Sequence, residues 1–138
     1  MIVVVIIGLL AALALPAMTR VQRNAKVTRF ISDLRTFSQA FEAHASTNGG
    51  WPPDGVPGSF PTGMTGDLKT AAWAGGTSLG GNWDWDYLQF GITAGISVHE
   101  PTVGLDLLTE VDRRIDDGDL TSGNFRRRSN GYIYVLEP

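Results

Sequence analysis

The sequence predicts an α+β fold: one long N-terminal helix, hydrophobic and then amphipathic, packed on a small C-terminal antiparallel sheet with long irregular loops. Three observations predict it. Residues 1–18 carry no charge and are almost entirely apolar. Apolar residues then recur at helical spacing until Asn48-Gly49-Gly50. Short β-type segments bounded by turn residues occupy the second half of the chain.

The apolar segment, MIVVVIIGLLAALALPAM, is the feature that most restricts the class of protein. As a helix it would extend about 27 Å at ~1.5 Å per residue, slightly less than a hydrocarbon core of about 30 Å. It could be a cleaved secretory signal, an ordinary membrane anchor, or an assembly helix that also spans a membrane. No basic segment precedes it here, and Pro16 fits a cleavage site poorly, so we favour the assembly helix.

The amphipathic continuation is expected to end near Ser46, because Asn48-Gly49-Gly50 is a typical helix stop. Pro16 removes one backbone hydrogen bond within the apolar part and predicts a bend there. The chain therefore divides into a transmembrane or filament-core segment (1–18), an amphipathic stem (19–50) and a globular head (51–138). One stripe of the stem should face the core, and its members are Val27, Phe30, Ile31, Leu34, Phe37, Phe41 and Ala45.

The head begins with a long Gly- and Pro-rich connection, residues 54–82, which predicts at most a short helical turn around 67–73. Trp83, Trp85 and Tyr87 then alternate with Asp84 and Asp86, which predicts a strand with an aromatic face and an acidic face. The remaining expected elements are a strand over 92–98 with a possible bulge at Gly95, a helix over 105–115, and a hairpin of 125–128 and 132–136 around Ser129-Asn130-Gly131.

Charge is distributed unevenly along the chain. Residues 1–36 carry a net charge of +4 and residues 37–138 a net charge of −7. We expect the basic stem to attract the acidic heads of neighbouring subunits through Arg20, Arg23, Lys26 and Arg29, although an ordinary solvated helix face explains these residues equally well. The acidic head argues against nucleic acid as the main partner.

Several side-chain groups are candidates for chemistry. Asp116, Asp117 and Asp119 gather carboxylates in a glycine turn, which suits calcium, but turn hydrogen bonds that end the preceding helix are the simpler explanation. The four Trp residues fit either a sugar-stacking platform or the core, and the core is favoured. Arg126-Arg127-Arg128 is interpreted as a solvated strand edge. The chain has no cysteine, which excludes thiol catalysis, and no phosphate loop or nucleophile elbow, so we expect no enzyme.

The N-terminal segment resembles that of type IV pilins and type II secretion pseudopilins. The resemblance rests on the Val/Ile run of residues 3–7, Gly8, the Leu/Ala run of residues 9–15, and Pro16. Gly50-Trp51-Pro52-Pro53 and the Asp-Asp-Gly segment after residue 115 are similar to pseudopilin segments at the same places. The family's Phe-Thr-Leu-Ile-Glu-Leu-like hexapeptide, with its assembly Glu, would precede Met1 and is missing, and we expect the sequence to begin at an internal Met.

The resemblance implies a non-enzymatic filament subunit that waits in the bacterial inner membrane and then enters a periplasmic or extracellular fibre. Its implied partners are further copies of itself, the lipid bilayer before assembly, and an inner-membrane platform with its ATPase. The alternative is a membrane-tethered or tip minor pilin that acts as a binding or adhesion module. The resemblance assigns filament and membrane contacts to Ile2, Val3, Val4, Val5, Ile6, Ile7, Gly8, Leu9, Leu10, Ala11, Ala12, Leu13, Leu15 and Pro16.

Overall fold

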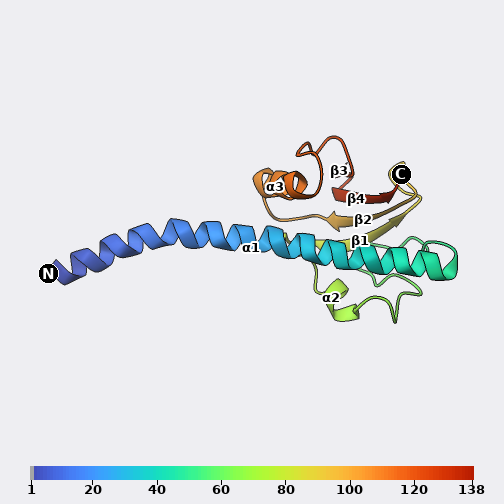
Figure 1. Cartoon of the computed structure of the whole chain (residues 1–138), viewed down its shortest axis with the longest axis horizontal. Helices are drawn as coiled ribbons and strands as arrows, with labels where there is room; N and C mark the ends of the chain where they lie inside the picture. Colours follow the sequence, from blue (N-terminus) through green and yellow to red (C-terminus); the bar gives the residue numbers. More distant parts are fainter. Residues whose placement is uncertain (1) are drawn as a thin grey trace.

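The computed structural model describes residues 2–138; Met1, the first residue of the predicted apolar segment, lies outside this range. The predicted α+β class is confirmed: a long helix, α1 (Ile2–Asn48), packs against a four-stranded antiparallel sheet. Helix α1 is continuous through Pro16 and projects well beyond the head at its N-terminal end (Figure 1). Gly49 ends it with a positive φ of 76° and an N–H that donates to the carbonyl of Ala45.

The remaining elements follow the predicted order with shifted boundaries. They are α2 (Thr70–Ala74), β1 (Asn82–Tyr87), β2 (Ala94–His99), α3 (Leu105–Ile115), β3 (Phe125–Arg128) and β4 (Gly131–Glu137). The strands lie in the order β1-β2-β4-β3, so β1 and β3 form opposite edges. The β2–β4 register shifts between Ala94 and Gly95, which confirms the expected irregularity at this glycine. The second strand begins at Ala94, and Ile92 instead packs from the preceding loop onto Ile133 and Val135.

The main core lies between α1 and the aromatic face of the sheet. The predicted stem stripe is confirmed: Val27, Phe30, Ile31, Leu34, Phe37 and Phe41 are buried and Ala45 is half-buried. Trp83 stacks on Phe30 with ring centroids 5.0 Å apart, and Trp85 stacks on Phe41 at 3.9 Å. Stacked aromatic pairs of this kind contribute about 0.5–1.5 kcal/mol each beyond their buried area. The sheet therefore packs against the C-terminal half of α1 only.

Residues 49–81 form the irregular connection, which runs beside α1 (Figure 1) and meets the edge strand β1, where the N–H of Gly58 donates to the carbonyl of Trp83. Met64, Trp73 and Leu79 from this connection are fully buried against the core. The Nε1–H of Trp73 donates to the carbonyl of Ser59, which satisfies its one polar atom. The connection therefore contributes buried side chains to the same core as α1 and the sheet.

Candidate functional site

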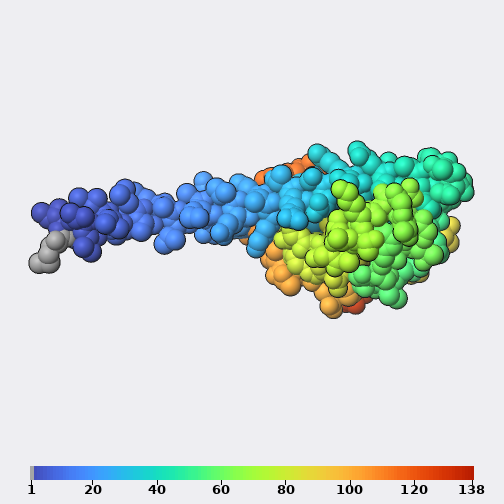
Figure 2. Space-filling model, turned by 90° about the horizontal axis from the view of Figure 1, so that it is seen from below, coloured from blue at the N-terminus to red at the C-terminus, as the bar shows by residue number. Residues whose placement is uncertain are grey.

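The apolar rod, residues 2–18 of α1, is not covered by any other part of the chain that the structure describes. Every residue from 2 to 26 is exposed, and the first buried side chain is Val27. Ile2 and Leu13 expose 78% and 76% of their surface, which soluble proteins do not tolerate along a whole helix. The rod is apolar and long enough to cross a membrane. Figure 2 shows the apolar rod projecting from the head.

One face of this rod is made of small residues. Gly8, Ala11 and Ala12 stand three or four positions apart and therefore lie on the same side of the helix. A Cβ atom added at Gly8 would meet no atom within 4 Å. Small side chains at such a face allow another helix backbone to approach closely.

The four basic residues predicted for intersubunit contact follow the rod along α1 and are not equivalent. They are Arg20, Arg23, Lys26 and Arg29. The guanidinium of Arg23 pairs with the carboxylate of Asp106 at the start of α3, within the same chain. Arg29 lies 3.9 Å from Asp33 on its own helix. Arg20 and Lys26 form no ion pair with any group of residues 2–138 and remain exposed.

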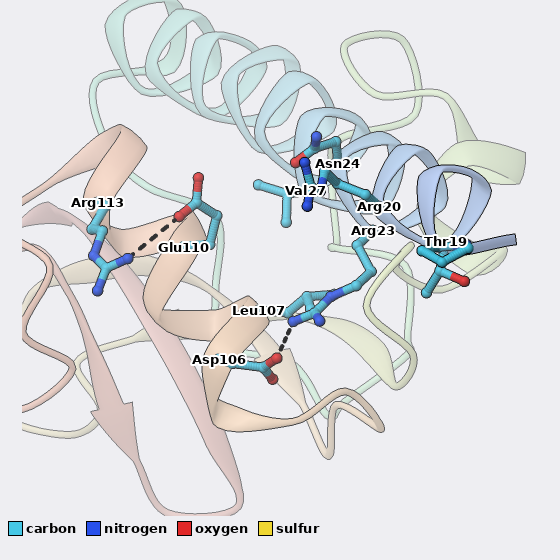
Figure 3. A pocket seen from close by; sticks show the side chains of 10 residues that line it. Thr19, Arg20, Arg23, Asn24, Val27, Asp106, Leu107, Glu110 and Arg113 are labelled. Atoms are coloured by element: carbon cyan, nitrogen blue, oxygen red, sulfur yellow. Dashed lines mark hydrogen bonds and ion pairs between the residues drawn. The ribbon is translucent and has the colours of Figure 1, made fainter. Parts of the chain in front are cut away.

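A groove of about 540 Å³ separates α1 from α3 beside these basic residues (Figure 3). Arg20 and Arg23 line it from α1, while Asp106, Glu110 and Arg113 line it from α3. Arg113 and Glu110 pair with each other at 3.7 Å, and Arg23 pairs with Asp106. These two pairs neutralise four of the five charged side chains that line the groove, and Arg20 has no ion-pair partner within residues 2–138.

The acidic turn after α3 brings two of the three predicted calcium candidates together with a carboxylate that the sequence analysis missed. Oxygens of Asp112, Asp116 and Asp117 lie within 4.8 Å of one another. Asp119 faces Thr121 instead, whose backbone N–H and hydroxyl donate to its Oδ1 at 3.0 and 2.6 Å. These two bonds lower the pKa of Asp119.

Asp112 is the buried member of this cluster. Its side chain has no exposed surface, and neither carboxylate oxygen has a hydrogen-bond partner. Burial raises the pKa of Asp112 to about 6, and the charges of Asp117 and Asp116 add to the rise, while the nearby N–H of Gly118 opposes it. The available sequence signal was its position, since Asp112 follows Leu108 by four residues on the apolar stripe of α3.

A second acidic group lies on the face of the sheet away from α1. Asp84 and Asp86 are buried there, and the Arg128 guanidinium lies 2.6 Å from Asp84 and 3.4 Å from Asp86. The ring of Phe90 covers this guanidinium at 4.7 Å. The interpretation of Arg128 as part of a solvated edge was therefore wrong, because its side chain is only 5% exposed and neutralises buried carboxylates. Arg127, its neighbour, is exposed as expected.

The alternative interpretation of the Trp residues, an exposed sugar-stacking platform, is not met in the part of the chain that the structure describes. Trp73, Trp83 and Trp85 are buried in the core, and the half-buried Trp51 donates from Nε1 to the Glu137 carboxylate. The core interpretation of these residues is confirmed for three of the four. A stacking platform for a sugar ring would need exposed ring faces.

Comparison with protein-family models, with curated proteins and with solved structures gave no match to this chain. The long apolar helix on a small antiparallel sheet is compatible with a pilin-like fold.

Proposed function

We propose that this protein is a structural subunit of a helical filament of the type IV pilus or type II secretion pseudopilus kind. The observation that carries the proposal is the uncovered apolar half of α1, joined without a break to a half that is built into a folded head. A side chain of this size gains about 1.5–3 kcal/mol on full burial, so a row of them will not remain in water. The rod needs either lipid or other protein helices around it.

We propose that lipid surrounds the apolar rod first and that helices of other subunits surround it later. Before assembly, Ile2–Leu15 lies in the bacterial inner membrane as an anchor, with the head on the extracytoplasmic side. During assembly the same segment leaves the lipid and packs among the helices of neighbouring copies. Packing within lipid gains little from hydrophobicity, so the small face at Gly8, Ala11 and Ala12 supports close helix contact in both environments.

Only two of the four basic stem residues support the predicted electrostatic contact with the acidic heads of neighbouring subunits. Arg20 and Lys26 are exposed and without an ion-pair partner within residues 2–138, so they are free to meet lipid headgroups or an acidic neighbouring head. Arg23 and Arg29 already have acidic neighbours in their own chain. We therefore assign the intersubunit role to Arg20 and Lys26 before the other two. An assembly platform and its ATPase in the inner membrane would drive the transfer into a fibre.

Cysteine cross-linking tests the proposal directly, because the natural chain has no cysteine and engineered positions report without background. Ala12→Cys places a thiol on the small face, whereas Ala43→Cys places one on the exposed face of α1 beside the head. In fibres sheared from the native host, oxidation should convert the Ala12→Cys protein into dimers and larger species. The Ala43→Cys protein serves as the matched control and should stay largely monomeric.

A second substitution separates anchoring from assembly. Ala12→Leu keeps the segment apolar but fills the small face, so the protein should remain in the membrane fraction while fibres are lost. The proposal fails if fibres form normally with Ala12→Leu and without cross-linking of Ala12→Cys. It also fails if the chain stays in the membrane as a monomer under conditions in which the host produces fibres.

The alternative of a binding or adhesion module gains no support from the aromatic residues. It depended on an exposed row of Trp side chains, and three of these are buried against α1. We therefore propose the structural role alone.

A further inference from the structure

We propose that the groove between α1 and α3 binds one phospholipid headgroup that carries both a phosphate and a primary ammonium, the chemistry of phosphatidylethanolamine. The inference rests on the membrane stage of the proposed function and names the lipid that the stem meets there. Three observations carry it: the place of the groove next to the apolar rod, an arginine without an ion-pair partner, and an acid that stands beyond that arginine.

The groove lies at the end of the apolar rod. Pro16 and Thr19 line it there, and Arg20 and Arg23 follow along α1. At about 1.5 Å per residue, Arg20 stands about 3 Å and Arg23 about 8 Å beyond Met18, the last residue of the rod. The headgroup layer on each side of a bilayer is about 5–8 Å thick. When the rod lies in lipid, the groove therefore opens into the headgroup layer.

Arg20 is the group that holds the phosphate. Its guanidinium is exposed and forms no ion pair with any group of residues 2–138. Three basic and two acidic side chains line the groove, so one positive charge remains for an anionic ligand. A guanidinium presents parallel N–H donors that match two oxygens of a phosphate. The arginine nearest the rod thus meets the part of the headgroup that lies nearest the acyl chains.

Asp106 is the group that accepts the ammonium. Its carboxylate pairs with Arg23 and therefore stands farther from the rod than Arg20 (Figure 3). In the headgroup the ammonium likewise lies beyond the phosphate. The Asp106 side chain is 63% exposed and accepts a hydrogen bond through Oδ2 only, so its Oδ1 is open to a further donor. Glu110, the other acid of the groove, already pairs with two arginines of its own helix.

The groove is formed before any lipid arrives. Val27 and Leu107 also line it, and both are buried in the core, where they fix the spacing of α1 and α3. Its volume of about 540 Å³ lies within the range of about 300–1,000 Å³ that is usual for small-molecule sites. The lipid therefore meets a site of fixed shape and charge order.

The order of charges selects among common headgroups. A choline headgroup has the same phosphate, but its quaternary ammonium has no N–H to donate to Asp106. A glycerol headgroup has no positive charge, so Asp106 repels its phosphate without compensation. Only a headgroup with a primary ammonium matches both ends of the groove.

Native mass spectrometry of the full-length protein in a mild non-ionic detergent provides the test. Lipids with identical acyl chains and an ethanolamine, choline or glycerol headgroup are added separately, and the Kd of the first bound lipid is measured. The ethanolamine lipid should bind about fivefold more tightly than the choline lipid, the scale of one ionic contact at a membrane surface. Arg20→Gln should weaken all three lipids by about fivefold. Lys26→Gln is the matched control, because Lys26 is an exposed cation of the same helix that does not line the groove.

Asp106→Asn makes a sharper prediction. It removes the acceptor of the ammonium and releases Arg23 from its ion pair, so the preference for ethanolamine should disappear and the glycerol lipid should become the tightest of the three. The melting temperature should stay close to that of the natural protein, because an exposed ion pair contributes little to stability.

Equal affinity of the natural protein for the three lipids, equal losses in Arg20→Gln and Lys26→Gln, or an unchanged ethanolamine preference in Asp106→Asn would each overturn the proposal. Displacement of the first lipid by millimolar inorganic phosphate would overturn it in favour of a free-phosphate site. A dimer that excludes the lipid would overturn it in favour of a second copy of the chain. The measurement needs no fibres, so its failure would leave the filament proposal standing, and loss of the cross-link in fibres would leave the lipid result unchanged.

Discussion

Arg128 on one edge strand of the sheet contacts Asp84 on the opposite edge strand, with Nη2 and Oδ2 2.6 Å apart. The side chain extends across β4 and β2 to make this contact. Both side chains are at most 5% exposed, so the pair is desolvated. It ties the two edges of the sheet together on the face that α1 does not cover.

Removing the positive charge of Arg128 should strongly destabilise the folded protein. Arg128→Met leaves Asp84 and Asp86 buried without compensation, and breaking a buried pair in this way typically costs about 3–5 kcal/mol. Chemical denaturation of the detergent-solubilised protein measures the loss. Arg127→Met, on the exposed neighbour, should cost less than about 1 kcal/mol. Equal losses in the two variants would show that Arg128 does not neutralise buried charge.

Asp84 should also make stability depend on pH. Its burial, reinforced by Asp86 and Asp54 and opposed by Arg128, raises its pKa to about 7 from 3.8. The folded protein then keeps a proton that the unfolded chain has released, so stability is greatest at low pH and falls as pH rises toward 7. The expected fall is about 1 kcal/mol per pH unit between pH 5 and pH 7.

Asp84→Asn isolates this effect, because an amide of the same shape cannot titrate. Melting curves recorded from pH 5 to pH 8 in EGTA should show a smaller decline for Asp84→Asn than for the natural protein. The raised pKa of Asp112 acts in the same direction and remains in both proteins. Identical declines would mean that Asp84 is already ionised throughout this range.

The sequence predicted those parts of the fold that depend on local patterns. The stem stripe, the buried Trp residues and the hairpin at Ser129-Asn130 follow from helical spacing, strand alternation and turn residues, and the structure confirms them. Asn130 adopts the positive φ of 59° that such a turn requires. In each case the residues that determine the element stand within a few positions of one another.

What could not be predicted depends on contacts between distant residues. Arg128 looked solvated because its partners stand more than forty positions away and meet it only when the sheet forms. Asp119 was preferred over Asp112 because it lies in the same turn as Asp116 and Asp117, while Asp112 lies one helical turn earlier. A loop position for Ile92 was also not evident, since a β-branched residue before Ala94 fits a strand equally well.

The stack of Phe41 on Trp85 should be a main support of the head. Phe41 is fully buried and touches the rings of Trp73 and Trp85, so Phe41→Ala should cost about 3–5 kcal/mol. Near-ultraviolet circular dichroism should lose intensity with it, because the Trp rings lose their fixed neighbour. Leu88→Ala, at a position 65% exposed, should change stability by no more than about 0.5 kcal/mol. Comparable losses in both variants would contradict this account of the core.

Deleting residues 1–18 should convert the protein into a soluble, folded monomer. No residue of 2–26 is buried, so the deletion removes no core contact, and the Arg23–Asp106 pair and the Arg114 contacts to α1 remain. The thermal unfolding midpoint should therefore stay within a few degrees of that of the detergent-solubilised full chain. Membrane flotation and analytical ultracentrifugation measure the two halves of the prediction. A shortened protein that still floats with membranes, or that has no cooperative transition, would show that the apolar rod contributes to the fold of the head as well as to its anchoring.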